Sequence, residues 1–279
     1  MDQIMLISSQ LSHGYVGGTA SQYILQRLGF DVCFLPTIRY SNHPGYAEYA
    51  KFEIGPYALS ETLDAIEKNA WLTKTVAIMT GYFPSVQHVA EAARIVERLK
   101  VTHPDAIYLC DPILGDDPGG LYIADAVARA IRSQLVPRAD FITPNRFELA
   151  WLSGHDVAGV SSALKAAHSL GCANVIATSI VDMIGGGECA DLQISHEVSK
   201  MAKWQRRNNV PHGSGDVLAA LFLGKYIRHR RMAEAFGLAV AGTRALINAA
   251  GEESSLPLVA AQDLWVDPHP APLVKVSSV

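Results

Sequence analysis

The stretch from residue 211 to residue 222 reads Pro-His-Gly-Ser-Gly-Asp-Val-Leu-Ala-Ala-Leu-Phe. Its glycines, Gly213 and Gly215, stand directly before an apolar run that predicts a buried helix from about Gly215 to Arg231. Glycines at a helix start let backbone N–H groups approach an anion, and the helix dipole adds partial positive charge there. The turn therefore predicts a phosphate-binding site. Asp216 is expected in the first helical turn, where it either accepts a proton from a hydroxyl or only complements the dipole; the flanking glycines favour the first role.

Two better-known phosphate motifs are missing from the chain. The pattern G-x-x-x-x-G-K-[ST] does not occur, so a P-loop is excluded. The glycines between Gly14 and Gly18 do not form G-x-G-x-x-G, which disfavours a dinucleotide-dependent dehydrogenase.

Alternating apolar runs and helical segments surround this turn. Such alternation is typical of a parallel sheet with crossover helices, and we predict strands at 4–7, 32–35, 75–79, 107–110, 141–142 and 175–178. A helix is expected from about Leu59 to Asn69, beginning after Ser60 as its cap. Residues 191–195 and 198–204 favour short antiparallel strands. The pattern predicts a single α/β domain over residues 1–279, with an antiparallel edge and a tail that is irregular from about residue 263.

Composition fits this fold and excludes several classes of protein. Of 279 residues, 49% are hydrophobic and 18% charged, enough to bury a sizeable core. A net charge of −4 gives no support to nucleic-acid binding. The four cysteines lack C-x-x-C spacing, which favours free thiols over a metal site. The N-terminal residues resemble neither a signal peptide nor a membrane span, so a cytoplasmic protein without membrane association is expected.

Polar residues gather where the predicted strands end, which is where open parallel sheets bind ligands. Each group alone is more typical of a turn, and only their recurrence indicates a site. His43 and Asp111 fit ordinary turns, Glu148 fits a helix cap reaching back to Asn145, and His212 fits a turn or a phosphate contact equally well. The groups are Ser8-Ser9-Gln10, Thr80-Gly81-Tyr82, Asp111-Pro112 with the glycine-rich residues 115–120, and Thr143 to Glu148.

Taken together, four motifs resemble the pyridoxal kinases of the ribokinase-like superfamily. They are Gly213 to Asp216, Ser41-Asn42-His43 followed by Tyr46, the run Cys110 to Asp116, and the run Ile142 to Glu148. The resemblance extends from Ile4 to about Gly251. It implies a three-layer α/β/α fold and ATP-dependent phosphorylation of the 5′-hydroxymethyl group of pyridoxal, pyridoxine or pyridoxamine.

The resemblance also implies roles for individual residues. Asp216 matches the catalytic base, and Gly213, Ser214 and Gly215 match the oxyanion-binding turn. On the substrate side stand Ser9, His43, Tyr82 and Tyr122, the last in a flap formed by residues 115–122. On the ATP side stand Asp111, Asn145, Glu148 and Thr178. Asp111 and Glu148 match the acidic positions that organise Mg²⁺ through waters around the ATP phosphates. A monovalent cation such as K⁺ and a homodimer are also implied.

Two departures from the family pattern keep alternatives open. Pro44 stands where the family often has a threonine that contacts the substrate, so the preferred vitamer is not defined. Ser9 is followed by Gln10 where a histidine is common. A hydroxymethylpyrimidine kinase of the same superfamily and a non-catalytic vitamer-binding protein therefore remain as alternatives.

Overall fold

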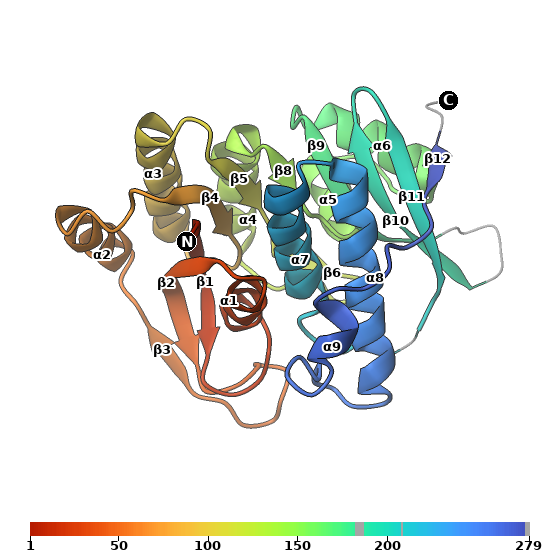
Figure 1. Cartoon of the computed structure of the whole chain (residues 1–279), viewed down its shortest axis with the longest axis horizontal. Helices are drawn as coiled ribbons and strands as arrows, with labels where there is room; N and C mark the ends of the chain where they lie inside the picture. The colour runs from red at the N-terminus through yellow and green to blue at the C-terminus, as the bar shows by residue number, and fades with distance from the viewer. Residues whose placement is uncertain (182–186, 208, 277–279) are drawn as a thin grey trace.

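The computed structural model describes residues 1–181, 187–207 and 209–276. Its main feature is a ten-stranded sheet in the order β12-β11-β10-β9-β8-β5-β4-β1-β2-β3 (Figure 1). The strands are β1 Gln3–Leu11, β2 Asp31–Tyr40, β3 Lys51–Glu53, β4 Thr75–Thr80, β5 Ile107–Cys110, β8 Phe141–Ile142, β9 Asn174–Val181, β10 Glu188–Ser195, β11 Ser199–Gln205 and β12 Val274–Val276. A separate pair, β6 Gly115–Asp116 and β7 Gly120–Leu121, forms a small hairpin.

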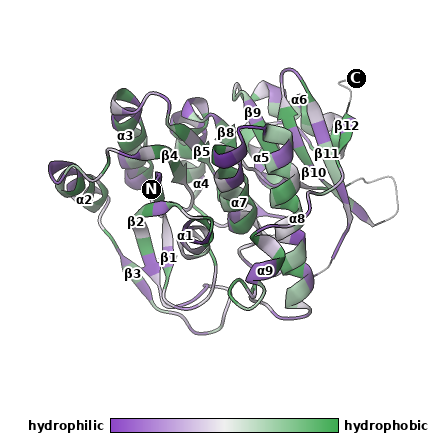
Figure 2. Cartoon of the chain, viewed as in Figure 1, coloured by the Kyte–Doolittle hydropathy of each residue, from purple (hydrophilic) through white to green (hydrophobic). Residues whose placement is uncertain are grey.

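Helices cover both faces of the sheet, and each face has its own apolar core. One face carries α1 Gly18–Arg27, α7 Ser214–His229, α8 Met232–Ala250 and α9 Gln262–Trp265, which lie toward the viewer in Figure 1. The other carries α2 Tyr57–Lys68, α3 Val86–Thr102, α4 Asp125–Ala130, α5 Arg146–Ser153 and α6 Val160–Ser169. Apolar residues dominate the central strands and α8 (Figure 2) because these elements are enclosed between layers. The predicted three-layer α/β/α fold is confirmed.

Strand direction divides the sheet into a parallel centre and antiparallel margins. The five pairings from β2 through β1, β4, β5 and β8 to β9 are parallel, whereas β10, β11 and β12 join antiparallel at one edge. The antiparallel strands β10 and β11 were predicted, whereas β12 was not. At the other edge β3 pairs antiparallel with β2, which was not predicted because residues 51–53 are all exposed and carry no apolar run.

The first strand is longer than predicted. We expected it to end at Ile7, with Ser8 and Ser9 in a turn, but β1 continues to Leu11 alongside an extended β2. The register shifts between Ser8 and Gln10, and the Ser8 hydroxyl accepts the backbone N–H of Tyr82 at 3.2 Å. Serines are typical of turns, but here both are buried and belong to the strand.

Two other boundaries were also wrong. Helix α2 begins at Tyr57, and Ser60 lies inside it, where its hydroxyl donates to the Glu91 carboxylate instead of capping the helix. The tail expected to be irregular from about residue 263 contains α9 and the sheet strand β12. Trp265 anchors this tail: it is fully buried, and its indole N–H donates to the Leu258 carbonyl at 2.9 Å.

The parallel centre places the site. The carboxyl ends of β1, β4, β5, β8 and β9 lie at one edge of the layer, and the start of α7 faces them across the cavity described below. Among the described residues, no helix is long and apolar enough to cross a membrane.

Substitution of Phe222 tests the core on the α7 face. Phe222 is fully buried, meets the ring of Phe141 edge-on and stacks on the ring of Tyr226. We expect Phe222→Ala to lower the free energy of unfolding by about 3–5 kcal/mol, because it leaves a cavity. Urea denaturation measures the change. The matched control is Phe52→Ala on edge strand β3, where Phe52 is 51% exposed; its cost should stay below about 1 kcal/mol. Equal costs would contradict this packing.

Candidate active site

The turn at the start of α7 depends on its two glycines for different reasons. Gly213 has a φ of 88°, in the left-handed region, and a Cβ there would lie 2.3 Å from the Tyr15 carbonyl oxygen. Gly215 has nothing within 4 Å of an added Cβ. Gly213 therefore shapes the turn, and Gly215 leaves the space in front of the helix N-terminus open.

Asp216 is held in place from the other end of the chain. Its Oδ2 accepts the backbone N–H of Gly17 at 2.8 Å, although the two residues are 199 positions apart. Gly17 is itself confined, because a Cβ there would lie 2.3 Å from the Ser9 hydroxyl oxygen. The glycine-rich segment after β1 thus orients the carboxylate that was predicted to act as the base.

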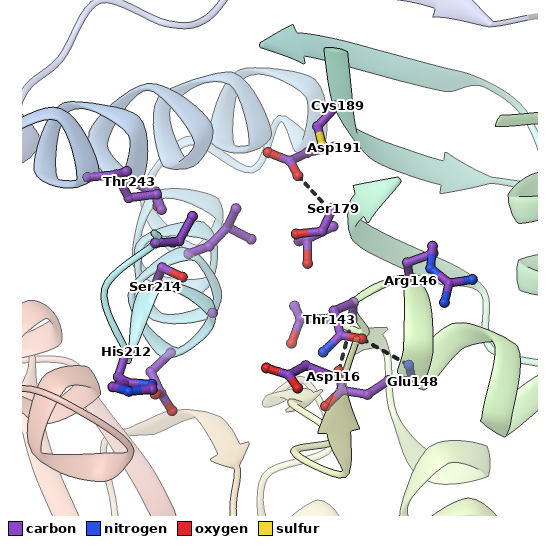
Figure 3. Close-up of a pocket in the computed structure, with 18 of the residues that line it drawn as sticks. Asp116, Thr143, Arg146, Glu148, Ser179, Cys189, Asp191, His212, Ser214 and Thr243 are labelled. Carbon is purple, nitrogen blue, oxygen red and sulfur yellow. Dashed lines mark hydrogen bonds between the residues drawn. The ribbon is translucent and has the colours of Figure 1, made fainter. Parts of the chain in front are cut away.

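A cavity of about 430 Å³ opens in front of this turn (Figure 3). Its wall comes from the start of α7, the loops after β5 and β8, the end of β9, and parts of β10, β11 and α8. Nine residues predicted for the site line it: Asp111, Tyr122, Asn145, Glu148, Thr178, Gly213, Ser214, Gly215 and Asp216.

Three buried carboxylates belong to this wall, and the pKa of each is raised. Desolvation by burial is the main cause at Asp111, Glu148 and Asp216. The charge of Asp216 raises the pKa of Asp111 further, and Asp111 acts likewise on Glu148. At Asp216 the Gly17 N–H opposes the shift, because it stabilises the charged form. Such a concentration of negative charge favours binding of a cation.

Hydrogen bonds fix the two carboxylates that were predicted to organise a metal. Asp111 Oδ1 accepts from the Thr143 hydroxyl at 2.8 Å. Glu148 Oε1 accepts the N–H of Leu114 and Oε2 that of Asn145, both at 2.9 Å. Asn145 in turn accepts the N–H of Glu148, so α5 begins with a capping box. The capping role of Glu148 is therefore confirmed, and its orientation follows from it.

These oxygen ligands fit a hard divalent cation. In the described part of the chain, no three His, Cys, Asp or Glu side chains come close enough together to enclose a metal ion. Mg²⁺ is compatible with this arrangement, since it retains several waters and is held by one or two carboxylates together with substrate phosphates.

The predicted flap is the β6–β7 hairpin with the residues that follow it. Arg146 forms an ion pair with Asp117, and the Asn145 side-chain amide donates to the Gly115 carbonyl at 2.8 Å. Tyr122 is 56% exposed and borders the cavity. The flap is thus anchored at Gly115 and Asp117 to the start of α5, and Tyr122 lies at the cavity mouth.

Three residues that were predicted to bind the substrate are not among the described residues that line the cavity. They are Ser9, His43 and Tyr82. Ser9 lies next to Gly17, which holds Asp216. The His43 ring stacks on that of His212, a cavity residue, with centroids 4.0 Å apart. Tyr82 contacts Ser8 through its backbone N–H. Ser9 and His43 therefore contact residues next to the Gly213–Asp216 turn, whereas Tyr82 contacts the end of β1 through Ser8.

Several cavity residues were missed by the sequence reasoning. They lie at the end of the cavity bounded by β10, β11 and α8, and are Asp191, Trp204, Arg206, Arg207, Thr243 and Arg244. A signal was present for one of them: Asp191 is a charged residue in the buried part of strand β10, whereas Glu188 at the start of the strand is exposed. Charged residues are rarely buried without a partner, so its position called for an explanation.

Comparisons with known proteins agree with this geometry. Residues 49–255 match the family model described as phosphomethylpyrimidine kinase. The pyridoxal kinase PdxY of Deinococcus radiodurans is 34% identical over 255 residues, covering 88% of this chain and 86% of that protein. The pyridoxal kinase of Leishmania donovani, solved with ADP and pyridoxine, superposes with a TM-score of 0.91 at 28% identity, covering 99% of each chain. That of Entamoeba histolytica also gives 0.91, at 26% identity, covering 99% of this chain and 100% of that one.

The fold and the glycine turn define a small-molecule kinase of the ribokinase-like type. With the identities above, the chain belongs to the pyridoxal kinase family.

The two glycines of the turn should respond differently to alanine. Gly213→Ala forces a side chain into a left-handed backbone, which alone costs about 1–2 kcal/mol, and also against the Tyr15 carbonyl. We expect a lower melting temperature for this variant. Gly215→Ala should melt like the native chain but lose vitamer-dependent ADP release, since its methyl group enters the ligand space. Unchanged ADP release in a folded Gly215→Ala chain would contradict a ligand at this turn.

Proposed function

We propose that this chain transfers the γ-phosphoryl group of ATP to the 5′-hydroxymethyl group of pyridoxal, and that Asp216 is the base. One observation carries the proposal: the Asp216 carboxylate, oriented by the Gly17 N–H, stands beside the open anion-binding turn at the start of α7. Names of relatives and the ADP, pyridoxine and pyridoxamine complexes of the Leishmania enzyme support it.

In this mechanism Asp216 accepts the proton of the 5′-hydroxyl as its oxygen attacks the γ-phosphorus. The bond between that phosphorus and the bridging oxygen of ADP breaks, and ADP leaves with the bonding electron pair. The N–H groups of residues 213–215 and the α7 dipole stabilise charge on the phosphoryl oxygens. The raised pKa of Asp216 suits a general base, since it makes the carboxylate a better proton acceptor near neutral pH.

The sheet order supports one binding region for each substrate. Ser9, His43 and Tyr82 come from the ends of β1, β2 and β4, and we assign them with Tyr122 to the vitamer. Asn145 and Thr178 come from the ends of β8 and β9, and we assign them with Asp111 and Glu148 to the nucleotide. The backbones of Asn145 and Thr178 form a parallel bridge, so these two residues face the cavity together.

Asp111 and Glu148 would hold Mg²⁺, largely through waters, and the ion would neutralise charge on the ATP phosphates. We further propose, from the family resemblance, a K⁺ requirement, a homodimer and a cytoplasmic location. Free thiols at Cys33, Cys110, Cys172 and Cys189 agree with a reducing compartment.

We expect excess EDTA to abolish turnover and added Mg²⁺ to restore it. Activity that survives EDTA would contradict the metal role.

Asp216→Asn tests the base. We expect turnover to fall by a factor of about 10²–10⁴, the usual contribution of general base catalysis, while pyridoxal still binds. Coupled ADP release measures turnover, and calorimetry measures binding. The control is Asp105→Asn, an exposed residue before β5, which should behave like the native chain. Equal turnover in Asp216→Asn would remove this residue from the mechanism.

A panel of substrates distinguishes the remaining functions. A hydroxymethylpyrimidine kinase is supported by the family model that spans residues 49–255, and Pro44 leaves the vitamer undefined. We expect ADP release with pyridoxal to exceed that with hydroxymethylpyrimidine, with pyridoxine and pyridoxamine ranked in the same assay. The reverse order would favour the pyrimidine kinase. Pyridoxal binding without ADP release would favour a non-catalytic binding protein.

A further inference from the structure

Strand β9 is irregular at the point where it enters the cavity. Its pairing with β10 matches Ile180 with Ala190 but Ala177 with Leu192, so the register shifts by one residue between them. Ser179, within this shift, has a φ of 58°, which residues other than glycine seldom adopt. Such bulges next to a site redirect side chains. Thr178 and Ser179 both line the cavity.

A buried carboxylate holds this bulge. The backbone N–H of Ser179 donates to Asp191 Oδ1 at 3.0 Å (Figure 3). Asp191 is fully buried on β10, and its Oδ2 accepts from Arg244 Nη2 on α8 at 2.9 Å. The Arg244 guanidinium lies 3.1 Å from the ring centroid of Trp204 on β11. One ion pair therefore links α8 and the antiparallel strands β10 and β11 to the backbone at Ser179.

The sheet itself does not account for this arrangement. β9 and β10 pair regularly on both sides of the bulge, and a regular ladder would satisfy the Ser179 N–H without any side chain. The observed arrangement instead combines a left-handed serine with a buried charge, and both are unfavourable on their own. Strain of this kind persists where the surrounding structure enforces it for a site.

The neighbouring wall of the cavity contains buried polar atoms that have no hydrogen-bond partner among the described residues. Thr243 Oγ1 and Arg244 Nε are buried, and neither has a hydrogen-bond partner among the described residues. Both residues line the cavity on α8. Buried polar atoms without partners are costly, so they indicate contact with a ligand or with water at this end. The sheet order places this end away from β1, β2 and β4, on the side assigned to the nucleotide.

We infer that Asp191, with Arg244 as its counter-ion, is a positioning residue that directs Thr178 and Ser179 toward the phosphates of the nucleoside triphosphate. The inference rests on the proposed function, and it attributes the affinity of the chain for the nucleotide to the buried Asp191–Arg244 ion pair. Asp191 acts through the bulge, without contact to the transferred group. Substitution of Asp191 should therefore change nucleotide binding, and it should leave vitamer binding and the position of Asp216 unchanged.

The test measures ADP affinity by calorimetry on the full chain, together with KM for ATP and for pyridoxal. Asp191→Leu removes both the acceptor for Ser179 and the partner of Arg244. We expect it to raise the ADP Kd and the ATP KM by about tenfold or more, as small misplacements in a site do, with the pyridoxal KM within about twofold. Asp191→Asn keeps an acceptor for the N–H, so it should show a smaller rise. If the leucine variant does not fold, the asparagine variant provides the test.

Asp140 offers a matched control elsewhere on the sheet. Its Oδ2 accepts the backbone N–H of Tyr108 and the Lys100 ammonium, both at 2.7 Å, so it combines the same two interactions away from the cavity lining. Asp140→Asn should leave the ADP Kd at the native value, even if it lowers stability.

The outcomes separate this inference from the proposed function. An unchanged ADP Kd in the folded Asp191 variants would overturn the inference, and so would parallel increases in the ADP Kd and the pyridoxal KM, which mark a general structural role. The proposed function alone would be overturned if the native chain binds ADP more tightly than the Asp191 variants but produces no ADP from ATP with any vitamer. A native chain that does not bind ADP would overturn both.

Discussion

The hydrogen bond from the Gly17 N–H to the Asp216 carboxylate is the interaction on which the site depends. It joins the segment after the first strand to the start of α7, and so brings the carboxyl end of β1 next to the glycine turn. Burial alone would favour the protonated acid, and this N–H partly offsets that effect by stabilising the carboxylate. The same bond aims the carboxylate, which a proton acceptor requires as much as a suitable pKa.

The parallel centre of the sheet makes this junction possible. Strand ends that are far apart in sequence meet along one edge, and the sheet order sorts them into two groups on either side of α7. The His43–His212 stack ties the loop after β2 to the residue just before Gly213. Tyr46 adds a second tie, since its hydroxyl lies 2.7 Å from that of Ser254 beyond α8. The loop after β2 is therefore held to the C-terminal part of the chain at two points.

Much of this was predictable from the sequence because local signals agreed with the global fold. Apolar runs predicted the central strands, and glycines before an apolar helix predicted the turn at Gly213. The failures share a physical cause. Ser8 and Ser9 were placed in a turn because their burial inside β1 depends on partners from β2 and β4. β12 gains its regularity only by pairing with β11. Asp191 was missed because its role arises from Ser179 and Arg244, 12 and 53 positions away.

The span of the Gly17–Asp216 contact has a consequence for how the enzyme comes into being. Both groups must be present before the reaction centre exists, and 199 positions separate them. During synthesis from the N-terminus, β1, β2 and β4 can pair long before α7 emerges, but Asp216 is not yet part of the chain. A nascent or prematurely terminated product that ends before α7 therefore lacks both the glycine turn and the Gly17–Asp216 contact, and the cavity in front of α7 cannot form until late in translation.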